Sequence, residues 1–266
     1  MKPLVFGTIP SAGSSRGALR EHLCWLLTGA IGRDVHAVVA DSYGDLLARI
    51  GDGEIEIAWL PPVLYVKAEE TLFVRLLVAG VRAHAAHFHG ALFTRKDSGI
   101  LTLEDLRNKR IAWVDRLSAA GYVFPRLALR QRGLGPEALG ASEIFAGSHA
   151  AVVEAVTRGD ADAGATFVNF AAAPLGVPAR IANAGWLALR SAVPMEMILS
   201  AGPIPSDVIV TAQSVDDATA DKLSDVLMRL HLHARGAKML KSFFGVEWLE
   251  PALPARYDAV RKAIEQ

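Results

Sequence analysis

Short apolar runs alternate with amphipathic stretches along the first part of the chain. The runs at 4–7, 35–40 and 55–60 are predicted strands, and between the first two, Leu19, Leu23, Leu26 and Leu27 recur at helical spacing. A turn rich in Pro, Ser and Gly, at 10–17, separates the first strand from this helix. Further helices are predicted to begin at Tyr43 and at Pro61-Pro62, where proline is tolerated. This order predicts a parallel sheet with helices on both faces.

The same alternation restarts in the second part of the chain. The further predicted strands lie at 72–81, 89–95, 110–114, 143–146, 162–167, 195–201 and 208–212. The further predicted helices lie at 103–106 with Thr102 as its cap, from Tyr122 to Gly133, at 150–158, at 217–234 and around Tyr257, Val260 and Ile264. The restart indicates a second α/β lobe, and Pro and Gly near 82–90 and 202–206 indicate two crossings between lobes.

A turn of small residues stands at the centre of this pattern. The stretch 115–126 reads DRLSAAGYVFPR and joins the predicted strand 110–114 to a helix. Small residues let another group approach the backbone closely, and the first amides of a helix form an anion site. Ser118 is placed to be the N-cap of that helix. Alone, this is a well-capped crossover turn, but a second, similar turn at Gly147, Ser148 and His149 favours an anion site.

Composition narrows the classes of function. The chain has 266 residues, 52% of them hydrophobic, which is enough for one large domain or two lobes. Its formal net charge is zero, so it has no basic field for nucleic acid or an anionic membrane. The single cysteine, Cys24, allows neither an intrachain disulfide nor a cysteine metal cluster, and we expect it to be buried. We see no signal peptide, so we expect either a periplasmic protein whose signal was removed or a cytoplasmic one.

Four stretches carry a resemblance to a known family. They read DSYGDLLARIGDGEIEIAWLPPVLYV at 41–66, LTLEDLRNKRIAWVDRLSAAGYVFPRLAL at 101–129, FAGSHAAVVEAVTRGDADAGATF at 145–167 and GPIPSDVIV at 202–210. Together they resemble the phosphate/phosphite/phosphonate class of substrate-binding proteins of ABC importers. The resemblance implies an α/β, two-lobe type II periplasmic-binding-protein fold, with mostly parallel sheets flanked by helices and two crossover hinge strands.

The resemblance also implies how the lobes are built and what they do. Lobe one would take residues 1–90 and 205–266, and lobe two residues 91–204. A small-molecule ligand would be trapped in the cleft between them by hinge closure and passed to a transporter permease. No cofactor, metal or nucleic acid is implied, and a monomer is expected.

The resemblance places candidate ligand-binding residues at the carboxyl ends of the predicted strands. It matches His149 to a Ser-His donor, His89 to a pocket tyrosine and Asp207 to an acid after Ile-Pro. The full set of expected ligand-binding residues is Tyr43, Trp59, His89, Ser118, Ala119, Ala120, Tyr122, His149, Thr166 and Asp207.

The chain departs from the family at two kinds of position. Phosphonate binders show Ser-Thr-Ser-Gly where this chain has Ser118-Ala119-Ala120-Gly121, so two hydroxyl donors are missing. Phe170 stands where binders of amino-phosphonates carry an acid. Each lost donor would cost about 1–3 kcal/mol where a buried acceptor is left unpaired. We therefore expect a less charged ligand than a phosphonate dianion, partly aromatic or apolar, such as a carboxylate or a sulfonate.

Simpler roles stay open for several of these residues. Tyr43 and Trp59 could be core residues, Asp207 could form an ion pair or a cap, and His149 could only begin a helix. His84, His87 and His89 form a cluster that lacks an accompanying carboxylate or cysteine, so a metal site is the minority interpretation. His231 and His233 are two apart on a predicted helix and are expected at the surface.

Two other classes of function stay open as well. The chain has no P-loop, no dinucleotide fingerprint after the first predicted strand and no H-E-x-x-H motif. The fold is nevertheless also used by some cytoplasmic biosynthetic enzymes, in which case His89, His149 and Asp207 would do acid–base work. A ligand sensor that reports binding to another protein is the third interpretation.

Overall fold

The computed structural model describes residues 2–9, 17–171, 178–189 and 193–266, which form two compact units. Unit 1 comprises Met1–His87 and Pro205–Arg261, and unit 2 comprises Phe88–Ile204 and Lys262–Gln266. The chain therefore passes between the units after His87, after Ile204 and again after Arg261. Of the turn predicted at 10–17, residues 10–16 lie outside the described residues.

A six-stranded sheet forms the centre of unit 1, in the order β12-β4-β11-β3-β1-β2. Its strands are β1 (Leu4–Thr8), β2 (Val35–Val39), β3 (Ile57–Leu60), β4 (Arg75–Val81), β11 (Val208–Thr211) and β12 (Trp248–Pro251). β1 pairs in parallel with β2 and β3, whereas β11 inserts antiparallel between β3 and β4. The carboxyl ends of β1, β2 and β3 therefore meet at one edge of this sheet.

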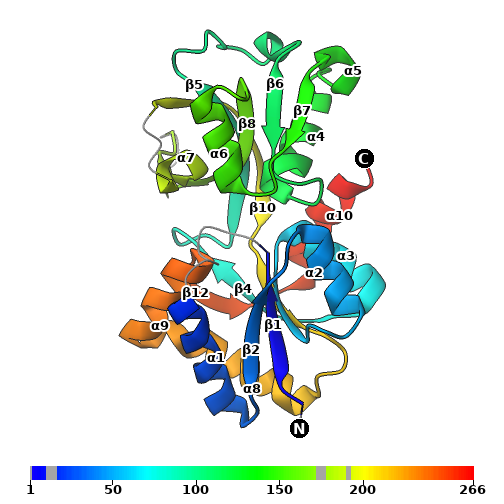
Figure 1. Ribbon diagram of the computed structural model, residues 1–266, viewed down its shortest axis with the longest axis vertical. Helices are drawn as coiled ribbons and strands as arrows, with labels where there is room; N and C mark the ends of the chain where they lie inside the picture. The colour runs from blue at the N-terminus through cyan, green and yellow to red at the C-terminus, as the bar shows by residue number, and fades with distance from the viewer. Residues whose placement is uncertain (1, 10–16, 172–177, 190–192) are drawn as a thin grey trace. The chain divides into compact units, whose positions relative to one another are not determined.

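Helices cover both faces of this sheet (Figure 1). The segments of unit 1 outside the sheet are α1 (Gly17–Ile31), α2 (Tyr43–Gly51), α3 (Pro62–Leu72), α8 (Asp217–Arg229), η3 (Leu230–Leu232), α9 (Ala234–Met239), η4 (Leu240–Phe244), η5 (Pro254–Tyr257) and α10 (Asp258–Ile264), the last of which ends in unit 2. One face packs Phe6 and Trp59 against Leu23, Leu27 and the residues of α8 and η4. The other face packs against α2.

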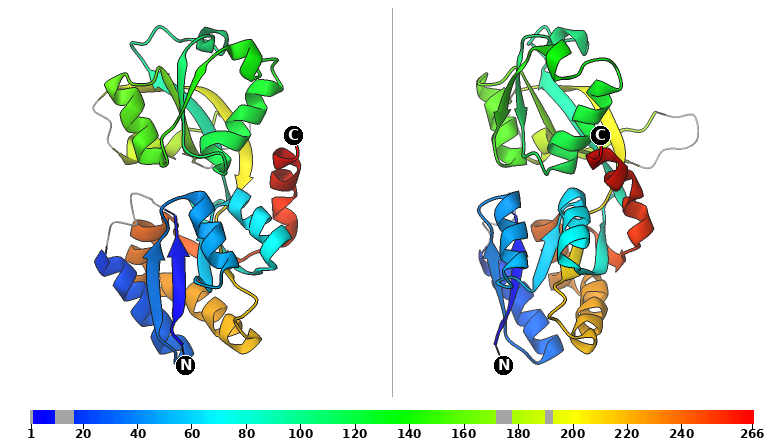
Figure 2. Two further views of the ribbon diagram at one scale, coloured as in Figure 1. Left: turned by 45° about the vertical axis from the view of Figure 1, so that its right-hand side comes forward. Right: turned by 90° about the vertical axis from the view of Figure 1, so that its right-hand side faces the viewer.

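A second sheet, in the order β10-β5-β8-β6-β7, forms the centre of unit 2. Its strands are β5 (His87–Arg95), β6 (Arg110–Trp113), β7 (Ser142–Phe145), β8 (Ala163–Phe170) and β10 (Met195–Pro205), and β9 (Ile181–Ala184) pairs with β8. The helical segments are η1 (Glu104–Leu106), η2 (Ala119–Val123), α4 (Phe124–Arg130), α5 (Pro136–Leu139), α6 (His149–Arg158) and α7 (Gly185–Ala188). Figure 2 shows the sheet between α6 and α7 on one face and α4 on the other.

Most predicted elements are confirmed, with the same type and nearly the same bounds. The predicted helix 217–234 is wrong after Arg229, because α8 ends there and the chain turns through η3 before α9 begins. Gly236 lies so close to the Leu230 carbonyl that a Cβ there would overlap it. This close packing of α9 on the preceding turn is not visible in the hydrophobic pattern, which continues across the break.

Smaller features also differ from the sequence prediction. Thr102 does not cap the helix at 103–106; instead the Asp105 carboxylate accepts hydrogen bonds from the amides of Leu101 (3.0 Å) and Thr102 (2.8 Å). The four-residue elements β9, α5, α7 and β12 were not predicted. Cys24 is buried as predicted. No helix among the described residues is long and apolar enough to span a membrane.

Candidate functional site

The two turns singled out in the sequence begin side by side in unit 2. β6 and β7 are parallel neighbours, with Trp113 paired to Phe145 at their carboxyl ends. The pairing continues into the turns, where the Ala146 amide donates to the Trp113 carbonyl (2.9 Å) and the Gly147 amide to the Val114 carbonyl (2.8 Å). The helices that follow, η2 with α4 and then α6, therefore both start at the same edge of the sheet.

The first turn opens with an unusual helical geometry. Ser118 is the N-cap, as predicted, and its Oγ accepts a hydrogen bond from the Gly121 amide (3.1 Å). The helix begins as a π-helix, because its first backbone hydrogen bond joins residues five apart, from the Val123 amide to the Ser118 carbonyl (2.9 Å). The amides of Ala119 and Ala120 come before that bond, so the helix does not use them. Neither amide has a hydrogen-bond acceptor within the described part of the chain.

Two glycines hold this turn against the sheet. A Cβ on Gly121 would overlap the Val114 side chain, and a Cβ on Gly90 in β5 would lie 2.9 Å from the Ala120 carbonyl oxygen. The small residues were expected to let another group approach the backbone. The groups that approach Gly121 and Gly90 belong to the protein itself, and they fix the position of the turn.

The second turn places a neutral histidine at the start of α6. Ser148 is the N-cap and accepts from the Ala151 amide (3.2 Å). The Nδ1 atom of His149 lies 3.0 Å from Oγ1 of the buried Thr166, and its ring stands edge-on to Phe167, with centroids 5.3 Å apart. Although the side chain is only half-buried, desolvation lowers the pKa of His149 to about 4. His149 is therefore uncharged at neutral pH.

Tyr122 lies beside the turn in an aromatic and cationic cluster. Its ring centroid is 5.4 Å from those of both Trp113 and Phe145. The Arg116 guanidinium lies over the Phe145 ring, 4.5 Å from its centroid, and 3.3 Å from the Tyr122 hydroxyl. These contacts fasten the turn to the ends of β6 and β7, and the Tyr122 hydroxyl, which accepts from Arg116, can still donate its own proton.

His89 and Thr166 lie on the opposite face of the sheet from η2. In β5, Gly90 faces η2, so by strand alternation its neighbour His89 faces away. His89 is half-buried, and its ring stands edge-on to Phe170 with centroids 5.1 Å apart. Thr166 pairs with Ala91, so it shares a face with His89.

The sequence analysis missed Asn169, near the carboxyl end of β8. Its side chain is buried, 6% exposed, and Oδ1 has no hydrogen-bond partner among the described residues. By strand alternation Asn169 shares the face of Phe167, which is the face of η2. Buried polar atoms are normally paired, so an unpaired one calls for an explanation. The signal was available, since Asn169 is an amide side chain within a mostly apolar strand.

The candidates in unit 1 are engaged within the protein. Tyr43 is 2% exposed and begins α2, whose N-cap is Ser42. Trp59 belongs to the core, 4.5 Å from Phe244 between ring centroids. Both positions agree with the core role that the sequence left open.

Asp207 forms an ion pair with Arg82, and both side chains are largely buried. Burial, together with the smaller effect of the Asp207 charge, raises the pKa of Tyr257, whose hydroxyl donates to the Ser206 carbonyl (2.6 Å). Asp207 thus belongs to a structural network of unit 1, as the ion-pair interpretation predicts.

The remaining histidines do not form a site. His84 lies 3.8 Å from the Glu247 carboxylate and beside Trp248, and His231 and His233 are exposed as predicted. Within the described parts of the chain, no group of three His, Cys, Asp or Glu side chains is placed to hold a metal ion.

Comparison with known proteins decides the family. The model of the periplasmic phosphonate substrate-binding proteins of ABC transporters matches residues 6–257. The chain belongs to this family. A curated member, the phosphate-import protein PhnD of Mycolicibacterium smegmatis, is 28% identical over 176 residues, which are 62% of this chain and 54% of the relative. The chain thus matches about half of the length of that relative.

Solved structures of the family share the fold. PhnD1 from Prochlorococcus marinus, in complex with methylphosphonate, has a TM-score of 0.81 at 17% identity and covers 99% of this chain and 97% of its own. A binding protein of a phosphonate transporter from Pseudomonas aeruginosa has a TM-score of 0.81 at 18% identity, covering 98% of this chain and 85% of its own. The predicted type II periplasmic-binding-protein fold and the family resemblance are confirmed.

Proposed function

We propose that this substrate-binding protein takes a small organic monoanion, a carboxylate or a sulfonate, and that unit 2 holds its charged group. The observation that carries the proposal is the pair of helix N-termini after β6 and β7, which start side by side at one sheet edge. Helix N-termini bind anions through unused amides and through the helix dipole.

The available charge favours one negative charge on the ligand. Each helix N-terminus is equivalent to about half a positive charge, so the two together supply about one. His149 adds none at neutral pH, because its pKa is about 4. Ala119 and Ala120 supply no hydroxyl donors where phosphonate binders have Thr and Ser. A dianion would therefore lack both charge compensation and hydrogen bonds.

Two side chains can still donate to an oxyanion. Oγ of Ser118 already accepts from Gly121, so its proton is free to point toward a ligand. If the Thr166 hydroxyl donates to Nδ1 of His149, the Nε2–H of the neutral ring becomes a donor. An anion next to Nε2 favours the tautomer that carries its proton on Nε2.

The remaining groups suggest the character of the rest of the ligand. Phe167 offers an aromatic surface next to His149. Asn169 offers a buried carbonyl oxygen that needs a donor, such as a hydroxyl or amide N–H of the ligand. Asn169 carries no charge, so an ammonium group would gain only a neutral acceptor there. We expect an aromatic or apolar body with at most a neutral hydrogen-bonding substituent.

The transport role is carried over from the family. We propose that residues 1–90 with 205–266 and residues 91–204 move as two lobes that trap the ligand, as the sequence resemblance implies. The ligand-favoured closed state would then be read by a membrane permease. We further propose that the protein acts as a monomer outside the cytoplasm.

The test compares ligands of one shape and different charge. Benzenesulfonate and phenylphosphonate are titrated by calorimetry into refolded, ligand-free protein, at a pH where the phosphonate is a dianion. We expect the sulfonate to bind at least tenfold more tightly, and the preference to shrink when the phosphonate is converted to its monoanion at lower pH. Tighter binding of the phosphonate dianion would contradict the proposal.

A single substitution serves as the matched control. Ala120→Ser returns one of the missing hydroxyls without changing charge. We expect it to improve phosphonate binding by about 1 kcal/mol, which is about fivefold, and to change sulfonate binding less. An equal effect on both ligands would mean that the missing hydroxyl does not select against the dianion.

A further inference from the structure

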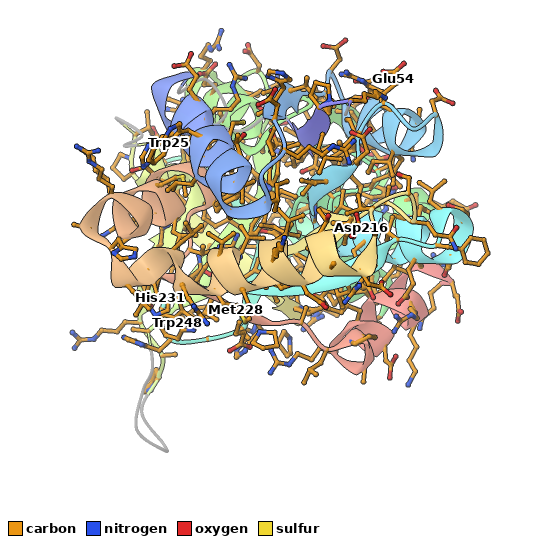
Figure 3. All side chains as sticks on the ribbon, turned by 90° about the horizontal axis from the view of Figure 1, so that it is seen from below. Trp25, Glu54, Asp216, Met228, His231 and Trp248 are labelled. Atoms are coloured by element: carbon orange, nitrogen blue, oxygen red, sulfur yellow. The ribbon has the colours of Figure 1, made fainter. Side chains whose placement is uncertain are left out.

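A groove outside the proposed anion site runs over the surface of unit 1. It lies between α1 and the segment that leads from α8 to α9, and it encloses a volume of about 520 Å³. Figure 3 shows α8 crossing near α1 on this face, with the Trp25 side chain on the side of α1 turned toward α8 and α9. Nothing in the proposed transport cycle uses this groove.

The wall formed by α1 is aromatic and apolar. Trp25 is 68% exposed, and its ring stacks on His22 with centroids 5.7 Å apart and an interplanar angle of 16°. Leu26 continues this wall one residue on, and Leu230 closes the groove on the opposite side. Covering a tryptophan that has two thirds of its surface in water would remove a large apolar area from solvent and so favour binding. Stacking on His22 holds its ring in one orientation.

The wall formed by α8 and α9 is cationic. Lys222, Arg229 and Arg235 line it, against the single carboxylate of Asp225. Among the described residues none of the three cations has a carboxylate within ion-pair distance. Two other acids of α8, Asp217 and Asp221, do not line the groove and form ion pairs with Arg75. Positive charge is therefore left in excess along the groove.

We propose that this groove binds an acidic amphipathic segment of another protein. Its apolar side chains pack on Trp25 and Leu26, and its carboxylates pair with Arg229, Arg235 and Lys222. Exposed Trp and Arg side chains are the residues that most often dominate binding energy at protein interfaces. A groove between two helices, apolar on one wall and charged on the other, fits the two faces of an amphipathic helix.

The openness of the groove favours a protein segment over a small molecule. A small ligand is normally enclosed on most of its surface, whereas Trp25 here faces solvent over 68% of its area. The excess of positive charge disfavours a second copy of this chain in the same groove, because like charges would then face each other.

The test selects partners without assuming their sequence. A displayed library of random peptides, each long enough for about four helical turns, is panned against the full chain. Enriched peptides are then titrated against the Trp25→Ala and Arg229→Glu variants. Leu101→Ala and Lys96→Glu are matched controls, since both residues are exposed and belong to unit 2. Circular dichroism and the thermal unfolding midpoint verify that each variant folds.

We expect the enriched peptides to be acidic and to lose at least tenfold in affinity with Trp25→Ala and with Arg229→Glu, but not with the controls. A peptide whose glutamates are replaced by lysines should regain binding to Arg229→Glu. The proposal would be overturned if the enriched peptides were neutral or basic, or if no peptide were enriched. It would also be overturned if the peptides bound both groove variants as tightly as the wild type. Displacement of the peptides by 1-naphthalenesulfonate at equal concentration would also overturn the proposal, because the groove would then take a small aromatic anion. A concentration-dependent dimer that Trp25→Ala abolishes would do the same, because the groove would then take a second copy of the chain.

Discussion

The carboxyl edges of the two sheets resemble each other in architecture but differ in what their polar groups do. In unit 2, the groups at this edge keep hydrogen-bonding capacity, as at Ala119, Ala120 and Asn169. In unit 1, Asp207 is paired with Arg82 and Trp59 is packed against Phe244. Two sheets with helices starting at similar places therefore do not offer equal recognition chemistry. We infer that unit 2 selects the ligand's charged group.

The largest effect is expected at Asp207. Replacing Asp207 by Asn removes the carboxylate that pairs with the Arg82 guanidinium in a largely buried setting. We expect the free energy of unfolding of unit 1 to fall by about 3 kcal/mol, measured by urea denaturation, because a largely buried ion pair is broken. Affinity for the sulfonate should stay within about twofold.

The matched control for this variant is Asp97→Asn. Asp97 also forms an ion pair, with Arg95, but both partners are at the surface. This substitution should change stability little, since exposed pairs contribute little. If Asp207→Asn instead abolished ligand binding while stability stayed unchanged, the contrast between the two units would be lost.

The next effect concerns the pH dependence of stability. The pKa of His149 is about 4 in the folded protein, against an ordinary value of 6.5. Between these values the unfolded chain binds the proton and the folded chain does not, so stability falls as the pH is lowered through this range. The contribution of His149 is fully present above pH 6.5 and lost below about 4, with a total of about 3 kcal/mol.

Carboxylates titrate in the same pH range, so the effect of His149 is measured as the difference in stability between the wild type and a variant that lacks this histidine. Denaturant unfolding of the wild type and of His149→Gln is followed from neutral to acid pH. We expect the wild type to lose more stability than the variant over this range. Parallel curves would show that His149 is solvated and able to carry charge, which would remove one argument for a monoanionic ligand.

The sequence predicted most strands and helices, because helices such as α2 repeat their apolar residues at helical spacing and strands such as β3 are apolar runs bounded by turn residues. It predicted Ser118 as a cap because a serine before an apolar helix has one simple role. It could not predict the π-helix after Ser118, which depends on how closely Gly121 packs on Val114 in three dimensions. The break after Arg229 escaped for the same reason, since Gly236 packs on Leu230.

The site was predictable to a different degree in each unit. In unit 2 the turns themselves carry the amides, so their place in the chain determines their place at the sheet edge. In unit 1 the candidates depend on where a side chain points, and one sequence does not fix the facing of Trp59 or the partner of Asp207. Asn169 was missed because a polar residue within a strand is informative only once its burial and its lack of a partner are known.

A pair of glycines tests whether the rigid turn matters for binding. Gly121→Ala in unit 2 would push against Val114 and Ser118, and Gly7→Ala in unit 1 would place a Cβ 2.7 Å from Ile55. Both should destabilise the protein by about 2 kcal/mol through overpacking. Only Gly121→Ala should also weaken sulfonate binding, by at least tenfold, because it displaces the cap of η2. Equal loss of binding in both variants would indicate a general effect of lower stability.

The smallest effect is expected from the two matched helix caps. Ser42 caps α2 in unit 1 and accepts from Asp45 (3.1 Å), as Ser148 caps α6 in unit 2 and accepts from Ala151 (3.2 Å). Replacing either by alanine should cost about 1 kcal/mol of stability, measured by urea denaturation, because one helix amide loses its acceptor. Sulfonate affinity, measured by calorimetry, should then distinguish the two variants. Ser148→Ala should weaken the sulfonate by about fivefold, since the cap sets the first turn of α6 and His149, and Ser42→Ala should leave it unchanged. If Ser42→Ala weakened binding as much, the α2 N-terminus that begins at Tyr43 would also recognise the anion, and charge selection would be shared between the units.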